Sequence, residues 1–453
     1  MDKPDWQGPL TEAYEQATRF LTGLPDRPVG SRATLEQLRA SLGGPLPAKG
    51  VGAREVVARL AEAADPGVVA SPSGRFFGFV IGGAMPAALA ADWLTATWDQ
   101  NAGLYAAGPA AAVVEEVAGE WLRELFGLPA TVSVGFVTGA QMSHVTALAA
   151  ARHEVLRRVG WDVETGGLHG APRISVLAGA DRHSTIDRAL RFLGIGTAAL
   201  VPVMVDAEGR MVTAALRDAL DGLDGPAIVC AQLGNVNTGA CDPIGEICDA
   251  AHAAGAWVHV DGAFGLWAAA SERHRHLVAG VERADSWTTD AHKWLNVPYD
   301  SGLVFCAHPS AHRAAMGIRA AYLVHAGGDE RDALEHNPEF SRRARGFAVY
   351  AALRSLGRDG VEALIDRSCA LAARFAARMA GHVLNDVVLN QVLVGFGPDT
   401  ADIVRQVQAE GTCWVSGTTW HDKPAMRFSV SNFSTDESDI DRSVDTILRL
   451  AGR

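Results

Sequence analysis

The chain has 453 residues, of which 48% are hydrophobic and 20% are charged, as in ordinary soluble globular proteins, and this length is enough for two domains. Its formal net charge of −12 argues against nucleic-acid binding, which needs a concentrated basic face. The first residues lack the pattern of a signal peptide, and no apolar run is long enough to cross a membrane. The six cysteines lack paired spacing, so we expect a cytoplasmic protein with reduced thiols.

The first 65 residues alternate amphipathic helical stretches, such as AREVVARLAEAA, with breaks rich in glycine and proline. Amphipathic helices need another apolar surface against their apolar faces, and this stretch has few residues with which to close a core of its own. We therefore predict that residues 1–65 form an N-terminal helical arm.

Between residues 130 and 307, short apolar runs alternate with segments of helical period. The predicted strands are VSVGFV, RISVLAG, PAIVCAQL, WVHVD, SWTTD and GLVFCA, and the predicted helices between them begin at Met142, His183, Val212 and Pro243. Continuous apolar strands separated by helices indicate an α/β fold with a mainly parallel sheet that helices cover on both faces.

After residue 340 the pattern changes to a long helix, the run VVLNQVLVGF, a second helix, the run AMRFSVSNF and a final helix. This order predicts a smaller α+β domain with an antiparallel sheet. The predicted boundaries are 1–65 for the arm, 66–340 for the large α/β domain and 341–453 for the small domain.

Ligands of such a sheet collect at the carboxyl ends of its strands, and two chemically useful side chains are predicted there. Asp261 ends the run AWVHVD, and Lys293 follows the run SWTTD. A lysine at the rim of a buried sheet loses hydration, so its pKa falls and its neutral amine becomes a nucleophile for carbonyl groups. The alternatives are a helix-capping aspartate and a lysine whose ammonium reaches solvent.

Together, an acid and a lysine on separate strand ends suit pyridoxal phosphate, whose aldehyde needs a lysine and whose ring nitrogen needs a carboxylate. A cradle for its phosphate is predicted at Gly139, where a strand ends and a helix with free amides begins. His183 stands at a second strand-to-helix turn, just before the predicted N-cap Ser184. A glycine turn or a lone histidine is more often structural. Gly139 and His183 therefore support a cofactor site only in combination with Asp261 and Lys293.

The stretches HVDGAFG and DAHKWLNVP resemble the group II pyridoxal-phosphate-dependent decarboxylases, the family of aromatic amino acid, glutamate and cysteine-sulfinate decarboxylases. RHSTIDRALRFLGIG is similar to the family segment with the ring-stacking histidine, and FFGFVIGGAMPAALAADWLTA is similar to the start of the family's large domain. The resemblance implies the fold-type I architecture of pyridoxal-phosphate-dependent transferases. It also implies a homodimer with the active site between the subunits, in which the arm wraps the partner.

The same resemblance implies roles for individual residues. Lys293 would form the Schiff base with the cofactor, Asp261 would pair with its ring nitrogen, and His183 would stack on its ring. Further cofactor contacts are implied for Gly139, Ala140, Gln141, Asn235, Ala263, Asp290 and His292.

One departure from the family concerns the fate of the carbanion. Family decarboxylases carry a mobile-loop tyrosine that protonates the carbon left by CO2. Here no tyrosine follows Tyr322 in the corresponding stretch, where His325 and His336 are the other proton carriers. In this family, loss of that tyrosine favours reaction of the carbanion with oxygen or another fate.

The aromatic residues Phe76, Phe77, Phe79 and Tyr105 match positions that line the family's substrate side. Aromatic residues at these spacings are equally often part of a core. If these residues line the substrate pocket, they favour an aromatic or bulky apolar amino acid as the substrate. Arg75 would instead suit a substrate with an acidic side chain.

The expected activity is decarboxylation of an L-amino acid. The alternatives of the same fold are decarboxylation-dependent oxidative deamination, as in aldehyde synthases, and aldol-type carbon–carbon cleavage. The alternative of another class is a protein that binds the cofactor without catalysis. We predict no metal site, because the close pair His274 and His276 lacks further ligands nearby.

Overall fold

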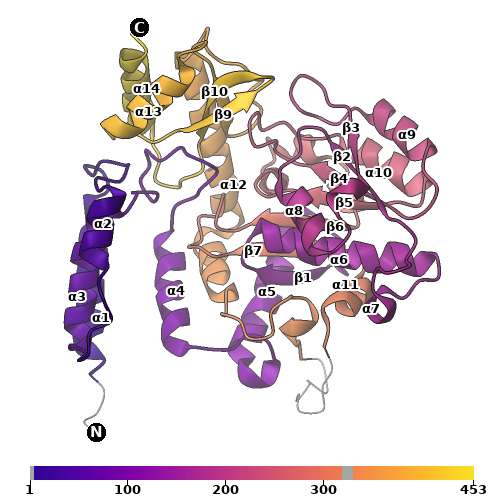
Figure 1. The fold of residues 1–453 in the computed structure, drawn as a ribbon, viewed down its shortest axis with the longest axis horizontal. Coiled ribbons are helices and arrows are strands. Elements are labelled where there is room, and N and C mark those ends of the chain that lie inside the picture. Colours follow the sequence, from indigo (N-terminus) through magenta and orange to yellow (C-terminus); the bar gives the residue numbers. More distant parts are fainter. Residues whose placement is uncertain (1–4, 319–329, 453) are drawn as a thin grey trace.

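The computed structural model of the protein describes residues 5–318 and 330–452. Along the chain it has a helical arm, a large sheet with helices on both faces, and a small sheet with its own helices (Figure 1). No helix of this described part is long and apolar enough to cross a membrane. The six cysteines are free and buried, as predicted for reduced thiols.

The large sheet has seven strands in the order β1-β7-β6-β5-β4-β2-β3. Their bounds are β1 (Ser133–Val137), β2 (Ser175–Gly179), β3 (Leu200–Val203), β4 (Ala227–Gln232), β5 (Trp257–Asp261), β6 (Ser286–Asp290) and β7 (Gly302–Cys306). The sheet is mainly parallel, because only β7 runs antiparallel to its neighbours β1 and β6. The α/β prediction is therefore confirmed. The prediction missed β3, a short strand at the edge of the sheet that contains Pro202.

Helices cover both faces of this sheet. They are α4 (Pro86–Trp98), α5 (Pro109–Phe126), α6 (Ala140–Arg158), α7 (Val163–Gly166), α8 (Thr185–Phe192), α9 (Thr213–Asp221), α10 (Ile244–Ala253) and α11 (Pro309–Met316). Side chains alternate between the faces along a strand. In β4, Ile228 packs with residues of α6 and α8, whereas Val229 packs with residues of α5, α9 and α10. This double coverage explains why the strands read as continuous apolar runs.

The small domain follows the long helix α12 (Gly346–Arg378). Its antiparallel sheet has the order β8-β10-β9, with β8 (Gln391–Val394), β9 (Ser416–Trp420) and β10 (Lys423–Ser429), and its helices are α13 (Thr400–Glu410) and α14 (Glu437–Leu450). Phe375 of α12 and Phe77 both stack on Phe428. Their ring centroids lie 3.6 Å and 3.8 Å, respectively, from the centroid of the Phe428 ring. Residues before the large sheet therefore help to build the core of the small domain.

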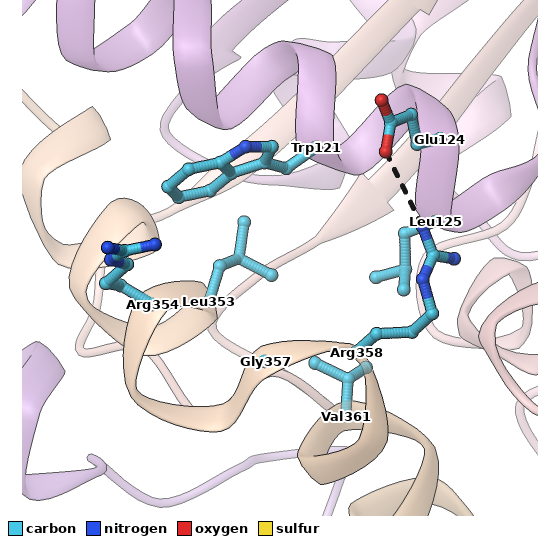
Figure 2. Close-up of a pocket in the computed structure, with 8 residues that line it drawn as sticks. All are labelled: Trp121, Glu124, Leu125, Leu353, Arg354, Gly357, Arg358 and Val361. Carbon is cyan, nitrogen blue, oxygen red and sulfur yellow. Dashed lines mark hydrogen bonds and ion pairs between the residues drawn. The ribbon is translucent and has the colours of Figure 1, made fainter.

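Helix α12 is interrupted at Gly357, whose φ of 63° lies in the left-handed region that favours glycine. A cavity of about 220 Å³ opens at this kink, between α12 and α5. Figure 2 shows Trp121 on one side of it and Arg354 and Arg358 on the other. None of its lining residues belongs to the site predicted from the sequence.

The arm consists of α1 (Gln7–Gly23), α2 (Leu35–Leu42) and α3 (Ala53–Ala64), which pack mainly on one another. Trp6, Leu10 and Tyr14 project from one side of the first helix and are 71%, 54% and 60% exposed. Arg75 joins the arm to the small domain, because its buried guanidinium donates hydrogen bonds to the carbonyl oxygens of Leu24, Pro25, Arg27 and Thr412.

Candidate active site

Lys293 lies in the loop that follows β6, at the carboxyl edge of the large sheet. Its Nζ is 3.0 Å from Oδ2 of Asp290, the last residue of the strand, and the aspartate side chain is only 2% exposed. The lysine side chain itself is 21% exposed. Its ammonium is therefore held by a buried carboxylate while one side of it stays open.

Asn296 fixes the shape of this lysine loop. It is fully buried and has a φ of 57°, a left-handed conformation that asparagine tolerates better than most residues. Its Oδ1 accepts hydrogen bonds from the amides of Gly83 and Phe433, and its Nδ2 donates to the carbonyl of Ser431. One side chain thus holds the lysine loop against segments from both domains.

The segment around Gly83 also touches the lysine directly. A Cβ on Gly82 would lie 1.9 Å from the carbonyl oxygen of Lys293, so only glycine allows this approach. The amide of Gly82 donates a hydrogen bond of 3.4 Å to the carbonyl of His292.

Asp261 ends β5, the strand next to β6, and its side chain is buried. Its Oδ1 accepts a hydrogen bond of 3.2 Å from the amide of Ala263, and its Oδ2 lies 3.5 Å from Nε2 of His144. Burial alone would raise the pKa of this carboxyl. The neighbours His144, His183 and Lys293 outweigh burial and hold that pKa well below its usual range, so the group is a stable carboxylate.

His183 lies just before α8, and its Nδ1 is 2.8 Å from Oγ1 of Thr185. Burial lowers the pKa of the His183 imidazole below its usual value, while the charge of Asp261 acts in the opposite direction. Lys293 and Arg427 also act on this pKa. The predicted acid, lysine and histidine therefore lie close enough to influence one another's charge.

Helix α6 begins at the predicted phosphate cradle. A Cβ on Gly302 of β7 would lie 2.4 Å from the Cα of Gly139, so the two backbones are in close contact. The amide of Ala140, however, donates a 2.6 Å hydrogen bond to Oδ1 of Asp290. The amide of Ala140, one of the residues implied for cofactor contacts, is thus used by the aspartate in this structure. The next residue, Gln141, donates from its side chain to the carbonyl of Thr185.

The remaining residues implied for cofactor contacts differ in the hydrogen bonds and ring contacts that they already make within the chain. His292 accepts a hydrogen bond from the amide of Ser301 at Nδ1, and its ring stacks on Tyr299 with centroids 4.2 Å apart. Ala263 connects the ends of β5 and β6, because its carbonyl accepts from the amide of Asp290. Asn235 is buried, and its side-chain amide bonds the backbone at Asp181, Asn237 and Thr238.

The four aromatic residues of the predicted substrate pocket are separated. Phe77 belongs to the small-domain core. Phe76 and Phe79 stack on Trp414, with centroids 5.1 Å and 5.3 Å apart. Of these, Phe79 is 54% exposed and has a φ of 56°, a strained conformation for a bulky residue. Tyr105 lies beyond the opposite end of α4, a helix of 13 residues and therefore about 20 Å long.

Three proton carriers were named in the stretch that corresponds to the family's mobile loop. Two of them, Tyr322 and His325, lie outside the described residues. His336 packs its ring against His312, with centroids 5.1 Å apart. Nδ1 of His312 is 2.9 Å from Oγ of Ser133, the first residue of β1. Within one chain, His336 therefore lies near the amino end of β1, whereas the cradle lies at its carboxyl end.

A family model described as the pyridoxal-dependent decarboxylase conserved domain matches residues 37–395. This match includes Asp261, Lys293, His183 and the cradle. The chain belongs to the pyridoxal-dependent decarboxylase family. Membership confirms the resemblance of the sequence motifs, and it makes pyridoxal phosphate the cofactor.

Individual relatives extend this assignment. The L-2,4-diaminobutyrate decarboxylase of Rhizobium meliloti is 33% identical over 334 residues, which are 70% of this chain and 64% of the relative, so the chain spans just under two thirds of that protein. The fold is shared with Oryza sativa TDC, solved with PLP and tryptamine, at a TM-score of 0.92 with 24% identity over 100% of this chain and 99% of that one. Rhodiola rosea 4-hydroxyphenylacetaldehyde synthase gives a TM-score of 0.87 with 22% identity over 99% of both chains.

The residues of this decarboxylase-family chain fit pyridoxal phosphate. A lysine amine, a buried carboxylate and an imidazole are the groups that its aldehyde, ring nitrogen and ring face require. Oε1 of Gln141, Nε2 of His144 and Nε of Arg427 are among the buried polar atoms that have no hydrogen-bond partner among the described residues. Buried polar atoms are rarely left unpaired, and a polar ligand is one way to satisfy such atoms.

The sequence motifs did not single out His144, His259, Tyr299, Trp414 or Arg427. His259 had a readable signal, since it stands two residues before Asp261 and therefore on the same face of its strand. His144 had none beyond its place one turn into α6, because its partner on β5 is distant in sequence.

Proposed function

We propose that the protein removes the carboxylate of an L-amino acid with an aromatic or bulky apolar side chain as CO2, with pyridoxal phosphate bound through Lys293. When bound, this cofactor supplies an aldehyde for amines and a ring that withdraws electrons from a bond at the substrate's α-carbon. The observation that carries the proposal is the meeting of Lys293, Asp261 and His183 at one edge of the sheet.

Each of these residues has a distinct part. Lys293 provides the amine, and Asp290, 3.0 Å away, is the group that can accept or return its proton. Asp261 keeps a negative charge where the ring nitrogen needs one. His183, whose pKa is lowered by burial, remains largely neutral near pH 7 and so can cover the ring without adding positive charge to it.

Arg427 supports an amino acid substrate. It lies on β10 of the small domain, and burial lowers the pKa of its guanidinium to about 10. The side chain is partly buried, and its Nε has no hydrogen-bond partner among the described residues. Removing a cation from water without a counter-ion is costly, and the carboxylate of a substrate would supply that charge close to His183.

Phe79 and Trp414 support the aromatic or apolar side chain. Phe79 stands three residues before the glycine that touches the lysine loop, and it presents an exposed ring beside that of Trp414. The acidic alternative loses its support, because the Arg75 guanidinium is used by backbone carbonyls. The Rhizobium relative acts on L-2,4-diaminobutyrate by its name, so a diamino acid is the second substrate class to test.

The fate of the carbanion has two alternatives of the same fold, oxidation to an aldehyde and aldol-type cleavage. The aldehyde alternative is supported by the likeness in fold to the Rhodiola rosea synthase and by the lack of a tyrosine after Tyr322 in the corresponding stretch. Binding of the cofactor without catalysis is the alternative of another class.

The test is to incubate cofactor-loaded protein with aromatic, apolar, acidic, diamino and β-hydroxy amino acids, with and without oxygen. We expect CO2 and the amine of an aromatic or bulky apolar substrate in equal amounts, without oxygen uptake. An aldehyde formed with oxygen uptake would replace decarboxylation by the oxidative reaction, and cleavage of β-hydroxy amino acids would replace it by the aldol-type reaction. No turnover of any class would favour the non-catalytic alternative.

We also propose a cytoplasmic homodimer with the active site at the subunit interface. The free, buried cysteines support a reducing compartment. The exposed apolar side of the arm supports a second subunit. If Tyr105 lines a substrate pocket as predicted, its distance from Phe79 along α4 means that it would do so in the partner's site.

A further inference from the structure

A row of buried polar side chains connects Asp261 with Trp257, at the other end of β5. His144 on α6, His259 on β5 and Ser286 on β6 are each 0% exposed. Nε2 of His144 is 3.5 Å from Oδ2 of Asp261, and its Nδ1 is 2.9 Å from Nε2 of His259. Nδ1 of His259 is 2.9 Å from Oγ of Ser286, which also lies 2.9 Å from Nε1 of Trp257.

The far end of this row sets the direction of its hydrogen bonds. The indole of Trp257 can only donate, so Ser286 accepts from it. If the hydroxyl hydrogen of Ser286 then goes to Nδ1 of His259, that histidine carries its proton on Nε2 and donates to Nδ1 of His144. His144 in turn carries its proton on Nε2 and points it at Asp261.

The opposite direction is less favourable. Ser286 Oγ would then accept from both Trp257 and His259, and its own hydrogen would have no acceptor among its partners in the described chain. A neutral His144 would turn the lone pair of Nε2 toward the Asp261 carboxylate. A buried unsatisfied hydroxyl costs free energy, and a lone pair facing a carboxylate is repulsive.

His259 has only one proton to place in this row. Burial lowers the pKa of its imidazole to about 3, so this histidine is neutral and has a single proton to give. Its register opposite Ser286 in the paired strands β5 and β6 is fixed by the sheet. The sheet therefore places Nδ1 of His259 beside the Ser286 hydroxyl, the contact through which the hydroxyl would select the tautomer.

We propose that His144 is a positioning residue for the cofactor's ring nitrogen, because it holds the Asp261 carboxylate in place, and that Ser286 and His259 fix the tautomer in which it does so. This inference rests on the proposed placement of the ring nitrogen at Asp261. Nε2 of His144 lies 3.5 Å from Oδ2 and has no other partner among the described residues, while Oδ1 accepts from the amide of Ala263, so a rotation of the carboxylate away from the ring would cost it both neighbours.

The consequence is a ring nitrogen that stays protonated over a wide pH range. A fixed carboxylate stabilises the protonated nitrogen, whereas a rotating or hydrated one does so less. Protonation of the ring nitrogen is a property of the bound cofactor that can be measured without turnover.

The test uses protein loaded with pyridoxal phosphate labelled with ¹⁵N in its ring, whose NMR shift reports protonation of that nitrogen. The variant His144→Phe removes both nitrogens at similar shape, and His144→Gln keeps one donor and one acceptor. The matched control is His312→Phe, since His312 is equally buried but bonds Ser133 at the amino end of β1.

In the wild type and in His312→Phe we expect the shift of a protonated ring between about pH 6 and about pH 9. In His144→Phe we expect the shift to move toward the unprotonated value within this range, with partial rescue in His144→Gln. We also expect kcat to fall about tenfold, the size of effect that loss of an orienting partner has at metal sites, with a smaller change in KM. A His144→Phe protein that keeps the wild-type ¹⁵N shift at all pH values would overturn the proposal.

Two further variants separate the possible failures. Ser286→Ala removes one small hydroxyl and the constraint on the His259 tautomer, so it should move the shift in the same direction even if His144→Phe does not fold. An unchanged shift in Ser286→Ala contradicts the proposed tautomer relay. Asp261→Asn tests the placement itself. If Asp261→Asn leaves the ring protonated, the placement fails, whereas a shift in Asp261→Asn alone means that only the relay fails.

Discussion

The Lys293 amine combines three properties at the scale of a single residue. It lies at the end of a central strand, it is 3.0 Å from a buried carboxylate, and the backbone of its loop is clasped by Asn296. The chain contains only three other lysines, at positions 3, 49 and 423. One of these, Lys423, lies at the exposed start of β10 and is a natural control.

We predict that Lys293→Ala abolishes turnover and the visible absorption band of lysine-bound cofactor, because no other described lysine lies at the sheet edge. Lys423→Ala should keep both the band and the activity. The measurement is an absorption spectrum of each variant after loading with pyridoxal phosphate and removal of the excess. A band that survives in Lys293→Ala would refute the assignment of this lysine.

The positions of Asp261, Lys293 and His183 were predictable because each stands where an apolar run ends, and ends of parallel strands meet at one edge. His144 was not predictable, because its role depends on packing of α6 against β5, which local patterns do not encode. The use of the Ala140 amide by Asp290 was equally hidden. It depends on a carboxylate 150 residues away in sequence.

At the scale of elements, Asp285 holds several pieces together at the amino edge of the sheet. Its carboxylate accepts a 2.7 Å hydrogen bond from the amide of Val258 in β5. It also lies 3.0 Å from Nε2 of His252 in α10 and 2.7 Å from Nε2 of His308, just before α11. Burial alone would raise the pKa of Asp285, but these partners outweigh burial and lower it below its usual value.

We therefore predict that Asp285→Asn lowers the free energy of unfolding by about 1–3 kcal/mol at neutral pH. A carboxyl whose pKa is lowered by folding stabilises the protein above its unfolded pKa of about 4 and loses this effect as the pH falls through the folded value. The difference between wild type and variant should thus be full at neutral pH and shrink below about pH 4. Urea unfolding at both pH values measures it.

The control for this prediction is Asp249→Asn on α10, the helix that contains the Asp285 partner His252. Asp249 is 64% exposed and pairs with Arg283, and exposed pairs of this kind contribute little to stability. We expect a small change at either pH. A loss in Asp249→Asn as large as that in Asp285→Asn would mean that the burial of Asp285 is not what matters.

At this scale, the strands that were predicted correctly are the buried ones. The strands at the centre of the large sheet are buried along their whole length and were found at their observed places. The edge strand β3 and the small-domain strand β9 were missed. In β9 (Ser416–Trp420) only the two end residues are buried, and the glycine and two threonines between them are exposed or partly exposed. The kink of α12 at Gly357 was not predicted, because the helical pattern continues on both sides of it.

At the scale of the whole molecule, side chains of the large domain join it to the small domain. Asn296 beside Lys293 bonds Phe433 and Ser431 of the small domain, and Phe77 lies in the small-domain core. The arm stands apart from this connected body along one side (Figure 1). Its attachment through Arg75 is at one end of α1, so most of that helix has no described partner beyond the arm itself.

The arm leads to a prediction about assembly. Trp6, Leu10 and Tyr14 follow one another at intervals of four residues and form one exposed apolar stripe on α1. A second exposed set, Trp93 and Trp98, lies on α4. Exposed apolar stripes of this kind mark protein interfaces. In a dimer with two-fold symmetry, an apolar stripe of one copy can pack against an apolar stripe of the other copy.

We predict that sedimentation of the wild-type protein gives twice the 47.7 kDa mass of the chain. The double variant Leu10→Glu/Tyr14→Glu should shift toward the mass of one chain, because carboxylates buried in the interface would destabilise it. Val159→Glu is the control, since Val159 is also 49% exposed but follows α6, away from the arm. Analytical ultracentrifugation at several concentrations measures the three proteins. If the dimer also completes the active site, the double variant loses activity with its dimer, and activity should return as concentration restores the dimer. A wild type that sediments as one chain and is fully active would refute both the dimer and the shared site.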